Sequence, residues 1–151
     1  MDTKINQDDK PDTLESRFAE ERSNWINMID EMSQQMKKVF DIPDLMTRIY
    51  TERQRAVDYY HYLLHILIKT NKEYRAKYAE RYDYYTYKSP IRYPNESSKN
   101  NKIMSELGDM VERRETIEGH SKFILSSIST IDNVIYAIPK RIEIDQIQRG
   151  K

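Results

Sequence analysis

The 151-residue sequence contains no cysteine, only three glycines and only five prolines. Without cysteine the chain has no disulfide framework, no cysteine zinc site and no thiolate nucleophile. Scarce glycine, together with a 33% share of charged residues, favours long helices over sheets and tight turns. We therefore expect an all-α protein with a single helical domain.

Long apolar runs are also missing: none approaches the roughly 18 residues that a membrane-spanning helix needs. The N-terminal sequence MDTKINQDDKPDT is acidic and polar, without the basic and then apolar order of a secretory signal. Both absences predict a soluble, intracellular protein.

Motifs that carry catalysis are absent too. The sequence has no G-x-S-x-G, no glycine-rich phosphate loop and no set of kinase motifs. His61 and His65 are four residues apart, a spacing that suits a metal, but no further ligand accompanies them. We expect no enzymatic activity, no metal and no other cofactor.

The order of polar, apolar and proline residues predicts how the chain is divided. Residues 1–12 are polar and charged and are expected to form a disordered acidic arm. Asp12 or Thr13 would cap the first helix, with Glu15 placed to answer Asp12 in a capping box. Within the domain at 13–151 we expect helices over about 13–40, 44–88 and 99–138, and a short element over 140–149, either helix or strand.

Two apolar seams have heptad-like spacing, in which steps of four and three alternate. In the second helix the seam comprises Ala56, Tyr60, Leu63, Leu67 and Tyr74. In the third it comprises Ile103, Leu107, Met110, Arg114, Ile117, Ser121, Ile124, Ile128, Ile131, Ile135 and Ile138. Pro139 is expected to end or kink this helix. The seams predict a helical hairpin or small bundle.

The second helix also carries apolar residues outside its seam, namely Ile49, Tyr50, Leu64, Ile66 and Ile68. A hairpin would bury one stripe on each helix and leave part of this surface uncovered. The first helix can cover some of that area, and the rest needs another partner. Contact between subunits is the simplest use of an exposed apolar surface, so we expect a homo-oligomer.

The formal net charge is zero, but the charges are segregated along the chain. Residues 69–92 hold seven cations and three acids. A ligand responds to charges within roughly 10 Å, so this local excess outweighs the neutral total. The same part of the chain is rich in tyrosine.

Ten of the twelve tyrosines lie between residues 50 and 87. Tyrosine rings can pack in a core or interface, and for Tyr60 and Tyr74 this is the simpler interpretation. Basic residues interleaved with aromatic ones are also typical of proteins that bind single-stranded nucleic acids. Tyr84 and Tyr87 lie off the face that Tyr60 and Tyr74 share, which suits stacking on bases. Composition alone leaves both interpretations open.

The run Glu80-Arg81-Tyr82-Asp83-Tyr84-Tyr85 resembles the K-A-R-L-D-Y-Y element of the UvsY recombination mediator family of T-even-like bacteriophages. The stretch KNNKIMSELGDMVERRETIEGHSKFILSSISTIDNVIYAIPKR is similar in layout to that family's last long helix, and the chain closes in Gly150-Lys151 as the family does. The resemblance covers roughly residues 44–151. Ala79 stands where the motif has its leading lysine, and the tail after Arg141 is shorter than in the family.

The resemblance implies a site at the end of the second helix. Its residues are Arg75, Lys77, Arg81, Lys88 and Arg92, which would contact phosphates, and Tyr82, Tyr84 and Tyr85, which occupy motif positions. Either Lys77 or Arg75 would replace the lost motif lysine. Asp83 would orient Arg81 or pair across a subunit boundary. Tyr84, with Tyr85 or Tyr87, would stack on bases.

The resemblance also implies the function and the partners. Members of the family form rings or open barrels of six or seven subunits and bind single-stranded DNA. They help load a UvsX-type recombinase onto strands coated by the phage single-strand-binding protein, in the cytoplasm of the infected bacterium, and the mediator itself needs no cofactor. The competing interpretation is a non-enzymatic, oligomeric coiled-coil interaction protein that binds no DNA.

Overall fold

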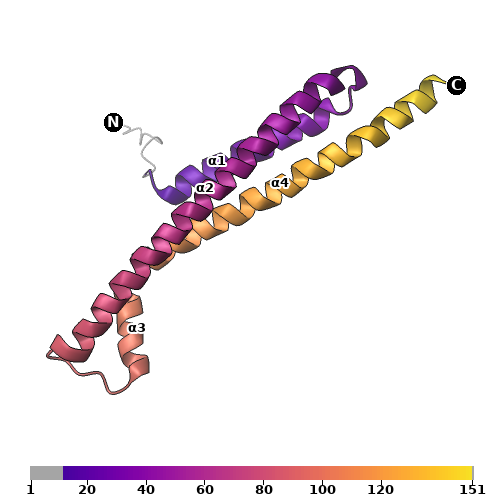
Figure 1. Cartoon of the computed structure of the whole chain (residues 1–151). Coiled ribbons are helices and arrows are strands. Elements are labelled where there is room, and N and C mark those ends of the chain that lie inside the picture. Colours follow the sequence, from indigo (N-terminus) through magenta and orange to yellow (C-terminus); the bar gives the residue numbers. More distant parts are fainter. Residues whose placement is uncertain (1–11, 151) are drawn as a thin grey trace, which may run out of the picture.

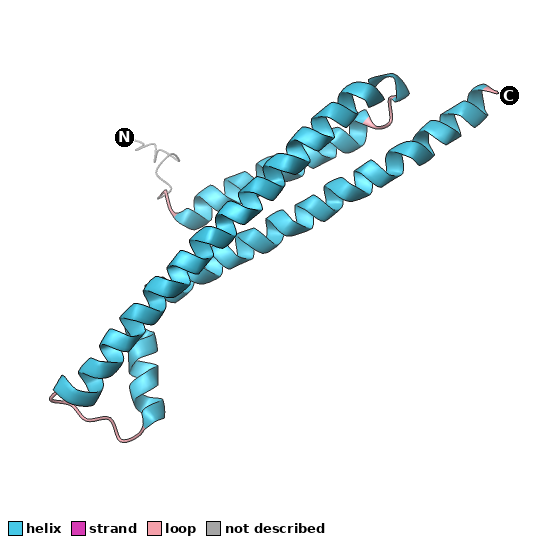
Figure 2. Ribbon diagram, in the orientation of Figure 1, coloured by secondary structure: helices cyan, strands magenta, loops and turns pink. Residues whose placement is uncertain are grey.

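The structure, a computed structural model, describes residues 12–150, and all the regular structure in that range is helical (Figure 1, Figure 2). The all-α prediction is therefore confirmed. The elements are, in chain order, α1 (Leu14–Gln35), the 3-10 turn η1 (Val39–Asp41), α2 (Ile42–Asp83), the π-helical turn η2 (Tyr84–Lys88), α3 (Glu96–Glu106) and α4 (Gly108–Arg149). Apart from Asp12, the predicted acidic arm lies outside the described residues.

Helix α2 runs the length of the molecule, about 63 Å for its 42 residues. Helix α4 packs antiparallel against α2, and α1 packs beside both along the first half of α2 (Figure 1). The short helix α3 lies against the far end of α2. Among the described residues, no helix combines the length and apolarity that crossing a membrane requires.

Two clusters of buried side chains hold the three long helices together. The first comprises Met32, Ile42, Leu45, Ile49, Ile131, Val134 and Ile138. The second comprises Phe18, Ala56, Leu63, Ile117, Ile124 and Ile128. Trp25 packs against both. Each fully buried large apolar side chain contributes about 1.5–3 kcal/mol, so these clusters fix the positions of α1, α2 and α4.

The apolar positions expected on α3 and α4 are largely buried within one subunit. Eight of the eleven are buried: Ile103, Leu107, Ile117, Ser121, Ile124, Ile128, Ile131 and Ile138. The other three, Met110, Arg114 and Ile135, are half-buried. Because α1 and α2 cover this surface, it is not available for contact between subunits.

The apolar residues that α2 carries outside its seam divide into two groups. Ile49 is fully buried, and Ile66 is half-buried against the second cluster. Tyr50 and Ile68 are 53% and 68% exposed. The part of this surface at Ile49 and Ile66 is therefore covered within the subunit by α1 and α4, and the expected contact between subunits concerns the part that stays exposed.

Helix α1 begins one residue after its cap, Thr13, whose side chain accepts a hydrogen bond from the backbone N–H of Ser16. Thr13 and Ser16 form the capping box, while Glu15 pairs with Arg22. The helix ends at Gln35 rather than near residue 40. The chain turns there, and the turn is held by Arg141, which donates a hydrogen bond to the carbonyl of Lys37.

The last long helix differs from the prediction at both ends. The expected helix over 99–138 is divided at Leu107, and α3 starts earlier, where Asn95 caps it. Gly108, which disfavours a helix interior, follows the division directly. Pro139 does not end the helix, and the separate element over 140–149 is part of α4. Burial of Ile138 and packing of Ile142 against the first cluster offset the backbone hydrogen bond that proline removes.

Candidate nucleic-acid interface

The predicted site lies where α2 ends, at the tip of the molecule opposite the end of α4 (Figure 1). The α-helix widens there into the π-helical turn η2, in which the N–H of Ser89 donates to the carbonyl of Tyr84 over 2.8 Å. Single π-helical turns occur frequently at functional sites. This turn carries Tyr84, Tyr85, Tyr87 and Lys88. We call the surface formed by residues 75–92 the α2 tip.

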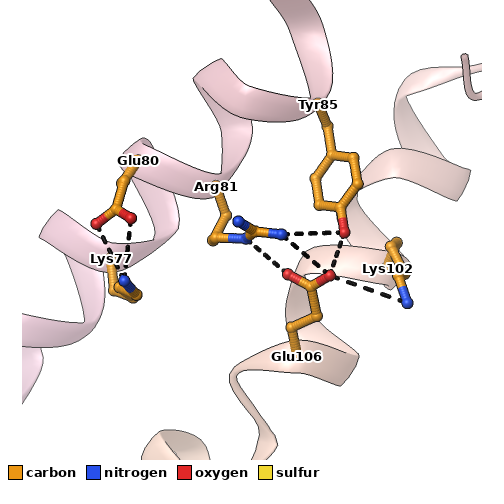
Figure 3. A network of polar contacts seen from close by, with 6 residues as sticks. All are labelled: Lys77, Glu80, Arg81, Tyr85, Lys102 and Glu106. Atoms are coloured by element: carbon orange, nitrogen blue, oxygen red, sulfur yellow. Dashed lines mark hydrogen bonds and ion pairs between the residues drawn. The ribbon is translucent and has the colours of Figure 1, made fainter. Parts of the chain in front are cut away.

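Arg81 is the centre of a polar network between α2 and α3 (Figure 3). Its Nε donates to Oε2 of Glu106 over 2.7 Å, and one of its terminal nitrogens donates to Oε1 of the same carboxylate over 3.3 Å. The hydroxyl of Tyr85 also donates to Glu106, and Lys102 Nζ lies 3.9 Å from Oε1. Both partners in the ion pair are accessible, since the side chains of Arg81 and Glu106 are 27% and 26% exposed.

The network shifts the proton affinities of its members in the directions that charge pairing predicts. Hydrogen bonding to Arg81 lowers the pKa of Glu106. Hydrogen bonding to Glu106 raises the pKa of Arg81, and it raises the pKa of Tyr85 as well. Near neutral pH the network therefore holds a carboxylate, a guanidinium and a neutral phenol.

The partner of Arg81 differs from our expectation. We expected Asp83 to orient Arg81 or to pair with another subunit, but the carboxylate that orients Arg81 is Glu106 of α3. The exposed side chain of Asp83 has no hydrogen bond or ion pair within residues 12–150.

Tyr84 and Tyr85 frame the guanidinium of Arg81. The carbon at the centre of that group lies 4.6 Å from the ring centroid of Tyr84 and 5.0 Å from that of Tyr85. The two rings meet edge to face at 5.2 Å, and Tyr85 makes a similar contact with Tyr93. Both tyrosines are half-buried, so each keeps part of its surface accessible.

Tyr82 is occupied by contacts with α3. Its hydroxyl donates to Glu96 over 3.0 Å, and Nζ of Lys99 lies 4.0 Å from its ring centroid. Lys99 is itself buried, and it donates to Glu96 and Thr86. One face of the Tyr82 ring is therefore covered, and in this structure the residue ties α3 to α2.

The remaining predicted cations differ in how free they are. Lys77 pairs with Glu80 over 3.0 Å. Arg75, Lys88 and Arg92 are exposed and make no hydrogen bond or ion pair with any residue in the described range. Tyr87 lies beside Lys88 and is 81% exposed. The α2 tip thus presents three unpaired cations and one freely accessible ring.

Sequence reasoning missed the contribution of α3. Helix α3 brings four charged residues to the α2 tip: Glu96, Lys99, Lys102 and Glu106. Two are cations and two are acids, so the local excess of positive charge is unchanged. Neither ion partner, Glu96 or Glu106, lies near α2 in the sequence. The one available signal was Gly108, which marks the break that lets α3 lie against the tip.

Comparison with protein-family models, curated proteins and solved structures finds no match to this chain.

Proposed function

We propose that the α2 tip binds single-stranded DNA and that the protein acts as a recombination mediator. The observation that carries this proposal is that Arg75, Lys88 and Arg92 of the α2 tip are exposed and unpaired within the described residues, and that the ring of Tyr87, next to Lys88 in the chain, is accessible. Proteins that bind single strands combine a basic track with aromatic faces on which bases stack. The sequence resemblance to a family of mediators points to the same end of α2, through Arg81, Tyr84 and Tyr85.

Binding at one tip would be weak. Phosphates would be held by the three free cations and by Arg81, and bases would stack on Tyr87 and on the accessible part of Tyr84. Each stacked base contributes about 1–3 kcal/mol. Several tips joined in one assembly would bind a single strand far more tightly, because the second and later contacts are intramolecular.

We place the contact between subunits on one flank of α2. Tyr50, Val57, His61, Leu64 and Ile68 follow one another at intervals that fit alternating steps of four and three, a helix-pairing pattern. Tyr50 and Ile68 are largely exposed, and Leu64 is half-buried. A hexamer or heptamer, as a ring or open barrel, is the assembly that the resemblance implies.

The remaining parts of the proposal rest on the resemblance alone. A strand held by such an assembly would be released from the phage single-strand-binding protein and passed to a UvsX-type recombinase. This step would take place in the cytoplasm of the infected bacterium. The chain would supply binding surface only, with no catalysis and no cofactor of its own.

A second candidate function is favoured by the same flank of α2. An exposed apolar stripe on a long helix is also what a coiled-coil interaction protein presents to a protein partner. In that case the tyrosines of the tip would be interface anchors, a use for which this residue type is enriched.

Titration of a fluorescent oligothymidylate with the full chain separates the two functions. The proposed function predicts that the logarithm of the binding constant falls linearly with the logarithm of the salt concentration. It also predicts that tyrosine fluorescence is quenched when bases stack on the rings. Absence of binding at about 20 mM salt, where phosphate contacts are strongest, would leave only the interaction protein.

A further inference from the structure

The guanidinium of Arg81 is occupied by a carboxylate of its own chain. Glu106 accepts from Nε over 2.7 Å and from a terminal nitrogen over 3.3 Å, so it uses one edge of the guanidinium as a strand phosphate would (Figure 3). That terminal nitrogen also donates to Tyr85 over 3.2 Å. An incoming phosphate must therefore displace Glu106 or accept a poorer geometry at Arg81.

Glu106 is held in this position by the packing of α3. The neighbouring side chains Ile103 and Leu107 are buried, and α3 contacts both α2 and α4. Tyr78 donates to Asn100 over 2.7 Å, and Lys99 donates to Thr86 over 3.0 Å, so α3 is tied to α2 along its length. The backbone that carries the Glu106 side chain is thus fixed at the tip.

A second cation, Lys102, lies close enough to pair with the Glu106 carboxylate when that carboxylate leaves Arg81. Nζ of Lys102 lies 3.9 Å from Oε1 of Glu106, and Lys102 is on the preceding turn of the same helix. A small rotation of the Glu106 side chain would exchange one cation for the other without unfolding α3. The carboxylate would then keep a partner while Arg81 turns to the phosphate.

We infer that Glu106 is an internal competitor of phosphate at Arg81, which lowers the affinity of each tip for a single strand. The inference rests on the proposed function, since it concerns the same site. The inference adds Glu106 to the site as a residue that sets the affinity for the strand without having to contact it. With weak individual tips, a strand is retained only where several tips engage it, and it can be passed on when contacts break one at a time.

Glu106→Gln tests the inference, because glutamine keeps the size of the side chain and removes its charge. The chain offers a matched control: Glu31 pairs with Arg48 over the same 2.7 Å, also between two helices. Arg48 lies 33 residues before Arg81 on α2, about 50 Å away. Glu31→Gln therefore makes the same change in net charge beyond the range of screened interactions.

Affinity for a fluorescent oligothymidylate is measured for both variants, and circular dichroism checks that helix content is retained. Glu106→Gln should bind about two- to fivefold more tightly than the wild type, the range expected when an accessible ion pair no longer competes. Glu31→Gln should stay within about 1.5-fold of the wild type. In an Arg81→Gln background, Glu106→Gln should give no gain, because the competition is then already absent.

The outcomes separate this inference from the proposed function. If the wild type binds and Glu106→Gln gains no more than Glu31→Gln, the inference is overturned and the proposed function stands. A gain that persists in the Arg81→Gln background would likewise overturn the inference and leave the proposed function standing. If neither the wild type nor Glu106→Gln binds at low salt, both are overturned.

Discussion

Nε2 of His120 lies 2.9 Å from a carboxylate oxygen of Glu21, although the two residues are 99 positions apart in the sequence. His120 is fully buried beside the second core cluster, and its ring stacks on Phe18 of that cluster at a centroid distance of 3.9 Å. The hydroxyl of Tyr59 donates to the same carboxylate. Nδ1 of His120 is buried and has no hydrogen-bond partner among residues 12–150. Helix α1 is thus joined to α2 and α4 by one polar cluster.

This cluster predicts a loss of stability in mild acid. Burial lowers the pKa of His120 below its ordinary value of 6.5, even though Glu21 favours the charged form. The unfolded chain therefore binds a proton more readily than the folded one, and the stabilisation present above pH 6.5 is lost as the pH falls. A proton on Nδ1 would also lack an acceptor in the folded state. Urea unfolding at pH 7.5 and pH 5.5 measures the loss.

His120→Phe is the matched variant, because the ring keeps its stacking on Phe18 and can no longer titrate. The free energy of unfolding of this variant should fall less than that of the wild type between the two pH values. An equal fall in both proteins would show that other groups cause the acid sensitivity.

Ile124→Ala should destabilise the folded subunit. Ile124 is fully buried in the second core cluster, and removing such a side chain costs about 2–5 kcal/mol. Its neighbour Leu125 is 47% exposed, so Leu125→Ala should change stability by about 0.5 kcal/mol or less. Urea unfolding of both variants gives the difference. Similar costs for the two changes would contradict the placement of Ile124 in the subunit core.

Ile68→Ser should reduce the size of the assembly while leaving each subunit folded. Ile68 is 68% exposed on the α2 flank assigned to subunit contact, so a polar side chain there removes interface area without opening a core cavity. Light scattering measures the mass. Ile26→Ser, a change at a 50% exposed position of α1, is the control and should leave the mass unchanged. An unaltered mass for Ile68→Ser would move the interface elsewhere.

Tyr87→Ala should weaken binding of single-stranded DNA by about 1–3 kcal/mol, the contribution of one stacked base. Tyr87→Phe keeps the ring and should retain most of the affinity. Tyr136 is similarly exposed, at 79%, but lies on α4 away from the tip, so Tyr136→Ala should have no effect. Equal affinities for Tyr87→Ala and the wild type would exclude stacking on this ring.

The helices themselves were predictable because they follow from local patterns. Period and propensity identified the all-α class, and Pro43 lies in the first turn of α2, where proline is tolerated. That α4 continues past Pro139 was not predictable, because the backbone cost of proline is local, whereas the burial of Ile138 that offsets it depends on residues of α1 and α2. The same tertiary packing decided which apolar residues of α2 stayed exposed.

The candidate site was predictable only in part. Exposure of Lys88 and Arg92 follows from a loop rich in polar residues and proline, which the sequence displays. The pairing of Arg81 with Glu106 depends on the break at Leu107, which folds α3 back against α2. A count of charges along the chain cannot show which cations are neutralised by acids 25 positions away.

The most direct test of strand binding at the α2 tip is the salt dependence of affinity for an oligothymidylate. It is measured for the wild type and for the double variant Lys88→Ser/Arg92→Ser. These two exposed cations carry no ion pair with any described residue, so replacing them should leave the fold intact. If both side chains contact phosphates, the affinity of the double variant should fall. The slope of log affinity against log salt concentration should then become shallower by about 1.4 for each subunit that contacts the strand. An unchanged slope and affinity would show that the α2 tip does not hold the strand.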